Sequence, residues 1–217
     1  MKRILLSLLA LGSIASLTAA PISYTVTLDS SAISGSTAGY IEFQFNQANA
    51  STSQAATASV SNFTSTGFMF DDLSNYSLGA VSGSLSAPPL AFDNTGGGTN
   101  LFDQGVSHFG SGFSFTLTLD GDALSNTVND GSEFFVYLLD SGFNNLAGPD
   151  GTVVASVVIN GNTTVSLNPV NGFSTITPAS SDAPEPSAIS LFGIGGAMVL
   201  SLRFLRLRRV SEFLKRS

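Results

Sequence analysis

Two glutamates are the first candidates for acid–base chemistry in the central part of this chain. Glu42 and Glu133 are the only glutamates between residues 21 and 182, and each lies in a segment that predicts a β-strand. Two carboxyl groups facing each other across a concave sheet could hydrolyse a glycosidic bond, one as the acid and the other as the nucleophile or base. The chain has no Trp and only four Tyr to stack against sugar rings. We therefore expect no enzyme, and the alternative is an exported glycan-active hydrolase that uses Glu42 and Glu133.

A second group of acidic residues could hold calcium. The segment DGDALSNTVNDGSE contains Asp120, Asp122, Asp130 and Glu133, together with side-chain amides. Carboxylate and amide oxygens are the ligands that Ca²⁺ prefers. The segment lacks the EF-hand pattern, because Leu124 stands where a third oxygen ligand is needed. A calcium site is thus one expectation, an acidic solvated loop is the other, and no further cofactor is expected.

The basic residues are confined to the two ends of the chain. All eight Lys and Arg lie before residue 4 or after residue 202, whereas thirteen of the fifteen Asp and Glu lie between residues 21 and 182. That central part therefore has a formal charge of −13, against −7 for the whole chain. Without cations to neutralise phosphates, it is not expected to bind nucleic acid or the surface of an anionic membrane.

The central part predicts an antiparallel all-β domain over residues 21–177. Alternation of apolar and polar residues marks four strands, at residues 24–29, 40–45, 113–120 and 163–167. Two further segments, 133–140 and 153–159, are apolar at nearly every position, which predicts central strands covered on both faces. Many short strands separated by close turns favour a β-sandwich of jelly-roll type. The chain has no Cys, so an apolar core and not disulfides must hold the fold.

The N-terminal end predicts export. Residues 1–20 begin with Lys2 and Arg3, continue with an apolar stretch and end in small residues, which is the layout of a secretory signal peptide. Everything between this peptide and a later membrane anchor would then lie outside the cytoplasm.

The C-terminal end predicts such an anchor. The uncharged run 187–202 would measure about 24 Å as a helix, short of a ~30 Å hydrocarbon core. Apolar residues up to 207 extend it to a transmembrane helix, and residues 208–217 form a basic cytoplasmic tail. Arginines at the end of the helix would stop its transfer and hold that end inside: Arg203, Arg206, Arg208 and Arg209.

A polar, Pro-containing linker, residues 178–186, precedes this helix and ends in Pro184-Glu185-Pro186. The motif, the apolar helix and the arginines, in this order, resemble the PEP-CTERM sorting signal of exported proteins in Gram-negative bacteria that make exopolysaccharide. The resemblance implies processing by exosortase, a membrane-embedded cysteine protease. The opening PISYTVTLDSSAISGSTAGYIEFQFN also resembles uncharacterised bodies of this family. One departure is VSEFLKRS, which continues past the arginines.

We therefore expect a membrane-anchored precursor that becomes a protein of the cell surface or the extracellular matrix. Its expected role is non-enzymatic and lies in adhesion, glycan contact or cohesion of an exopolysaccharide or biofilm layer. The expected partners are exosortase, the membrane through the C-terminal helix, and exopolysaccharide.

Overall fold

The computed structural model describes residues 20–35, 37–124, 131–146, 155–160, 164–170 and 172–179. In these ranges the regular elements are strands and three single-turn 3-10 helices, and every strand pair with a resolved register is antiparallel. This confirms the all-β class that the alternation predicts. The described residues include no helix long and apolar enough to cross a membrane. The expected signal peptide and transmembrane helix lie outside them.

One sheet has six strands in the order β13-β1-β9-β3-β7-β6. Its strands are β1 (Ile22–Asp29), β3 (Thr57–Thr66), β6 (Val81–Ser82), β7 (Leu90–Asp93), β9 (Gly112–Asp120) and β13 (Ser174–Pro178). Its outer face carries mainly Ser and Thr, because most polar positions of β1, β3, β9 and β13 point outward.

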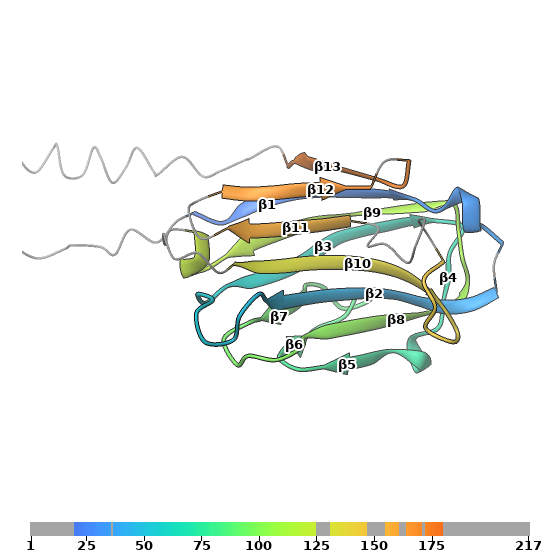
Figure 1. Ribbon diagram of the computed structural model, residues 1–217. Coiled ribbons are helices and arrows are strands. Elements are labelled where there is room, and N and C mark those ends of the chain that lie inside the picture. Colours follow the sequence, from blue (N-terminus) through green and yellow to red (C-terminus); the bar gives the residue numbers. More distant parts are fainter. Residues whose placement is uncertain are drawn as a thin grey trace, which may run out of the picture. The chain divides into compact units, whose positions relative to one another are not determined.

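The other sheet has seven strands in the order β12-β11-β10-β2-β8-β4, with β5 also paired to β8. Its strands are β2 (Thr37–Gln47), β4 (Met69–Phe70), β5 (Tyr76–Leu78), β8 (Leu101–His108), β10 (Ser132–Asp140), β11 (Ala155–Asn160) and β12 (Thr164–Pro169). Figure 1 shows β8, β2, β10 and β11 side by side in this sheet. Three 3-10 turns complete the elements: η1 (Ser31–Ile33), η2 (Asp72–Ser74) and η3 (Asp122–Leu124).

The inner faces of the two sheets share one apolar core. Phe43 of β2 lies edge-on to Phe115 of β9 at 5.6 Å between ring centroids, and Phe134 of β10 lies edge-on to Phe92 of β7 at 6.0 Å. All four rings are at most 1% exposed. Burying a side chain of this size contributes about 1.5–3 kcal/mol, so these rings, which join both sheets, carry much of the packing free energy.

The predicted inward side of β9 is confirmed. The four residues expected to face the core are all buried: Phe113, Phe115, Leu117 and Leu119. Strand β10 differs from the prediction. Its inner residues are buried, but Glu133, Phe135 and Tyr137 on its outer face are only partly buried, so the expectation of a strand covered on both faces is wrong there. Of the three apolar outer positions of β10, Phe135 and Tyr137 are partly exposed aromatics, and Leu139 is buried.

The free edge of β8 is closed by a short segment that includes β4, η2 and β5. Asp71 N donates to Gly105 O at 2.9 Å, and Gly105 N donates to Asn75 Oδ1 at 2.9 Å. A Cβ on Gly105 would collide with the Asp71 carbonyl and with Ser74, so a glycine is needed for the segment to lie this close. The edge that would otherwise offer unpaired backbone groups is thereby covered, and the outer side of β8 becomes partly buried.

Candidate functional site

Four side chains form one row across the outer face of the seven-stranded sheet. Tyr137 of β10 lies opposite Glu42 of β2, Glu42 lies opposite Asp103 of β8, and Asp103 lies opposite Tyr76 of β5. Opposite residues of an antiparallel pair point to the same face, with Cβ atoms about 4.5–5.5 Å apart. The row thus spans three strand spacings, about 14 Å, with two carboxyl groups in the middle and a tyrosine at each end.

The two carboxyl groups are in direct contact and one of them is buried. Asp103 is 3% exposed, is hydrogen-bonded to Glu42 through its side chain, and has its other oxygen, Oδ1, buried without a partner among the described residues. Burial, then the charge of Glu42, then this hydrogen bond raise the pKa of Asp103 to about 7. Below that pH the Asp103 carboxyl is protonated.

A ladder of amides along β2 orients Glu42. Gln44 Nε2 donates to Glu42 Oε1 at 2.5 Å, and Asn46 Nδ2 donates to Gln44 Oε1 at 2.8 Å. Asn46 Oδ1 in turn accepts from Asn100 N at 2.9 Å. Alternate residues of one strand share a face, so the three side chains lie in line and offer hydrogen-bonding groups along the sheet.

Aromatic rings surround this polar centre. Tyr40, next to Glu42 on the same face of β2, stacks on Phe143 with ring centroids 4.8 Å apart and planes 5° apart. Phe135 stacks on Tyr137 along β10 at 6.0 Å. Phe143 is 57% exposed and Tyr76 is 52% exposed, so ring surface is open to solvent on both sides of the carboxyl pair.

The turn after β10 holds Phe143 in place. Asp140 Oδ1 accepts from the backbone N–H groups of Gly142 and Asn144, both at 2.8 Å, and Phe143 N donates to Asp140 O at 3.0 Å. These bonds lower the pKa of Asp140, the side-chain bond from Asn144 most of all. Phe143 takes a left-handed φ of 62°, uncommon for a non-glycine residue, and this carries its ring over Tyr40.

The two glutamates singled out from the sequence do not form a pair. Glu133 lies opposite Asn46, four residues along β2 from Glu42, which corresponds to about 13 Å at the rise of a strand. Glycosidases place their carboxyl groups about 5–9.5 Å apart. The neighbour of Glu42 is instead Asp103, which the sequence analysis missed. An acidic residue inside the largely apolar run LFDQGV was the available signal, but only the β2–β8 register pairs it with Glu42.

The residues expected to bind calcium are only partly described. Asp120 ends β9 on the outer face of the six-stranded sheet, whereas Glu133 lies on the outer face of the seven-stranded sheet, so these two carboxylates are on opposite faces. Asp122 begins η3, and Asp130 lies outside the described residues. In the described ranges no group of three or more His, Cys, Asp or Glu could hold a metal ion. Calcium binding near Asp120 and Asp122 stays a prediction.

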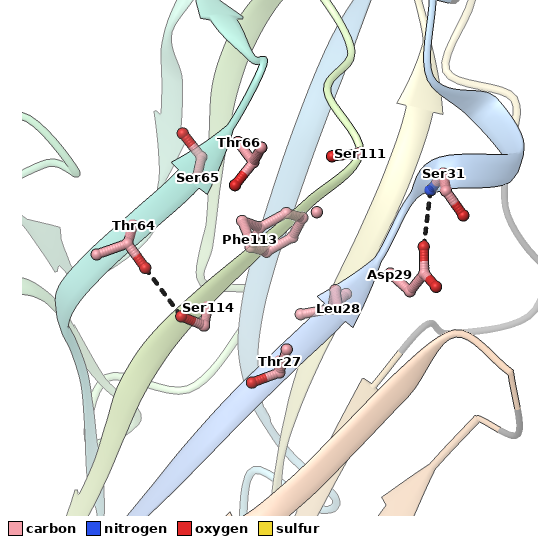
Figure 2. A pocket seen from close by; sticks show the side chains of 11 residues that line it. Thr27, Leu28, Asp29, Ser31, Thr64, Ser65, Thr66, Ser111, Phe113 and Ser114 are labelled. Atoms are coloured by element: carbon pink, nitrogen blue, oxygen red, sulfur yellow. Dashed lines mark hydrogen bonds between the residues drawn. The ribbon is translucent and has the colours of Figure 1, made fainter.

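A hollow of about 500 Å³ lies on the six-stranded sheet, where β1 and β3 end and β9 begins (Figure 2). Hydroxyl groups line much of it, and Figure 2 shows Thr64 and Ser114 hydrogen-bonded to each other at 2.9 Å. Asp29 accepts from Ser31 N at 2.9 Å, and its bonds to Ser31 lower its pKa. Phe113, the one aromatic residue that lines this hollow, is only 3% exposed, so the hollow has less accessible ring surface for a ligand than the carboxyl–aromatic face.

The sorting residues Pro184, Glu185 and Pro186 lie outside the described residues, as do the four arginines that follow the apolar segment. Comparison with known proteins finds no family model that matches the sequence, no similar curated protein and no similar solved structure. The chemistry of the carboxyl–aromatic face must therefore be argued from its own geometry.

Proposed function

We propose that this chain is a non-enzymatic glycan-binding protein of the cell surface or extracellular matrix, and that it binds glycan on the outer face of the seven-stranded sheet. The observation that carries the proposal is the row Tyr137–Glu42–Asp103–Tyr76, with the ring pairs Tyr40–Phe143 and Phe135–Tyr137 beside it. Sugars present apolar ring faces and hydroxyl groups. Exposed aromatics and in-line amides and carboxyls match both.

The geometry favours binding over hydrolysis. Glu42 and Asp103 touch, so they leave no room for a sugar or a water between them, and Glu133 is about 13 Å along the strand from Glu42. The row is about 14 Å long, and the rings of Tyr76 at its end and of Phe143 beside it are exposed. These features suit an extended oligosaccharide lying across the strands. Export by the signal peptide, sorting by exosortase and the jelly-roll arrangement of the sandwich are part of the same proposal.

A glycan array with the purified full-length protein tests the proposed function. We expect binding to oligosaccharides, weakened about tenfold by Tyr40→Ala and by Tyr137→Ala, since each change removes one stacking surface. Thr25→Ala is the matched control, because Thr25 is exposed on the outer face of the other sheet. Unchanged binding in both tyrosine variants, or equal loss in the control, would place the glycan elsewhere.

A further inference from the structure

We infer that the carboxyl–aromatic face selects amino sugars, with the ammonium group of a glucosamine-type unit bound beside Glu42 and Asp103 and between the rings of Tyr137 and Tyr76. This inference rests on the proposed glycan-binding function and specifies its ligand class. It follows from the charge of the row, from an oxygen without a partner and from the flanking rings.

The carboxyl pair has no cation of its own. Residues 21–182 contain no Lys or Arg that could neutralise Glu42, and their single histidine, His108, lies five residues along β8 from Asp103, about 16 Å at the rise of a strand. The other titratable groups of the packed elements are carboxyl groups and tyrosines, apart from His108 at the end of β8: Glu133, Tyr137 and Asp140 on β10, Tyr40 on β2, Tyr76 on β5, and Asp71 and Asp72 at η2. Asp71 accepts from Leu73 N and Ser74 Oγ, and Asp72 accepts from Gln104 Nε2. A cationic ligand therefore meets only attraction at this row.

An unpaired oxygen marks the place where a donor is missing. Asp103 is only 3% exposed, yet its Oδ1 has no hydrogen-bond partner in the described part of the chain. Buried polar atoms are nearly always paired, and leaving one unpaired is unfavourable. An ammonium group has three N–H donors and no acceptor, so it can bond to Glu42 and still present a donor toward Asp103.

The rings at the two ends of the row suit a cation as well as a sugar. A cation near the face of a Tyr ring is attracted by the ring's quadrupole, and a sugar ring stacks on the same surface. Tyr76 is 52% exposed, so its ring is accessible. A neutral sugar would gain the stacking but would leave the carboxyl pair without a counter-charge. An amino sugar would gain the stacking and would also place a positive charge beside the carboxyl pair.

A metal ion fits the row less well than an ammonium group. Ca²⁺ takes six to eight oxygen ligands, and this row offers two carboxyl groups. The amide next to them turns its N–H and not its oxygen toward the pair, because Gln44 Nε2 donates to Glu42. The occupant that matches two carboxyls, an amide donor and flanking rings is an organic cation.

Binding of a cation should release the shared proton. Burial and the neighbouring Glu42 hold the proton on Asp103 up to a pH of about 7. A positive charge beside the pair stabilises the ionised form of Asp103, so the proton leaves as the ligand enters. At pH 6 an amine with an ordinary pKa near 8 is itself charged, and the proton released then comes from the protein.

Isothermal titration calorimetry of the full-length protein at pH 6 tests the inference, with a β-1,4-linked glucosamine pentamer and the N-acetylglucosamine pentamer as probes. We expect the charged pentamer to bind at least about tenfold more tightly, with proton release measured by repeating the titration in buffers of different ionisation enthalpy. Glu42→Gln and Asp103→Asn should abolish the preference and the proton release. Tyr137→Ala should weaken both pentamers.

Asp29→Asn is the matched control, since it removes one carboxylate from the other sheet and should leave the preference intact. Equal binding of both pentamers would overturn the inference and leave the proposed function standing, whereas binding of neither would overturn the proposed function as well. A preference that persists in Glu42→Gln and Asp103→Asn would mean attraction by the overall negative charge, and it would also overturn the inference. Melting curves of each variant separate lost binding from lost folding.

Discussion

Asp103 of β8 lies directly opposite Glu42 of β2, and their side chains hydrogen-bond to each other while Asp103 is almost completely buried. Two carboxyl groups on one face of adjacent strands repel each other when both are ionised. Ionisation of both groups is therefore unfavourable in the folded protein unless a cation lies beside them. This contact makes the stability and the ligand preference of the domain depend on pH.

The first prediction is that stability falls as the pH rises from about 4 to 7. The folded-state pKa of Asp103, about 7, is above the value of 3.8 for an ordinary Asp, so the folded protein binds more protons than the unfolded one in this window. The stabilisation is therefore complete below pH 4 and is lost as the pH rises through 7, by up to about 4 kcal/mol. Urea unfolding at pH 5 and pH 8 measures the loss.

Asp103→Asn is the variant that tests the cause. Its amide can donate to Glu42 as the protonated acid does, but it cannot ionise, so the decline between pH 5 and 8 should flatten and the melting temperature at pH 8 should rise. Asp29 and Asp140 provide the contrast. Their folded pKa values are lowered, so their contribution is present above the ordinary value and is lost as the pH falls through the folded value. If the loss of stability between pH 5 and 8 is unchanged in Asp103→Asn, another titrating group causes it.

A second prediction separates the core from the binding face by two Phe→Ala changes. Phe134 is 1% exposed and contacts the rings of Phe43, Phe92 and Phe115, so Phe134→Ala should destabilise the domain by about 3–5 kcal/mol. Phe143 is 57% exposed, so Phe143→Ala should lower the stability little. The same change should weaken glycan binding, because the Phe143 ring stacks on Tyr40. Chemical denaturation and glycan titration of both variants give the comparison. A large loss of stability in Phe143→Ala would contradict a role in binding alone.

The third prediction concerns the space beside Gly39 of β2. A Cβ there would collide with the Leu139 carbonyl and lie 2.9 Å from the Phe109 ring, and both neighbours are buried. Gly39→Ala should therefore destabilise the domain by about 1–3 kcal/mol, which corresponds to a melting temperature lower by several degrees. Gly96→Ala is the control, because a Cβ at Gly96 meets nothing within 4 Å. Similar melting temperatures for the two variants would show that β2 can move away from β10 at this point.

The alternation of apolar and polar residues predicts some strands of the domain and fails to predict others. Strands β1 and β9 and the central part of β2 alternate because one face is buried and the other is wet, and the sequence shows them clearly. Strand β8 does not alternate: five successive residues, 102–106, are buried, since η2 covers part of its outer side. The apolar run of β10 predicts two buried faces, but Phe135 and Tyr137 on its outer face are only partly buried. An apolar run is the same in sequence whether its second face is covered or binds a ligand.

The carboxyl pair shows why the candidate site could not be predicted. The sequence pairs Glu42 with Glu133 as candidate residues, because both are glutamates on predicted strands. Strand order and register decide which carboxyls meet, and β2 lies between β10 and β8. Asp103 is brought to Glu42 by long-range pairing that no local pattern encodes. The rings beside them come from three different strands and a turn.

The fourth prediction is that millimolar calcium raises the melting temperature relative to chelator. This prediction rests on the acidic segment that begins at Asp120 and Asp122, because residues 21–182 contain no Lys or Arg to pair with it. Ligand at 100 times its dissociation constant would add about 2.7 kcal/mol. Because Glu133 faces the opposite side of the sandwich from Asp120, Asp120→Asn should abolish the effect and Glu133→Gln should not. An unchanged melting temperature, or equal loss in both variants, would contradict a site built around Asp120.

The last prediction is that the chain is cleaved at or near Pro184-Glu185-Pro186, so that the mature protein lacks the arginine tail. Two prolines remove two backbone N–H donors and bias the preceding residues toward extended conformations, which suits a protease at the membrane face. The arginines Arg203, Arg206, Arg208 and Arg209 would hold the apolar segment in the membrane during export and fix the depth of the cleavage site. Replacing the motif by alanines should leave export intact and stop cleavage, whereas neutralising the four arginines should disturb retention first. Mass spectrometry of the protein from its native host decides the matter, since a main surface species that extends to Ser217 would identify an ordinary membrane anchor.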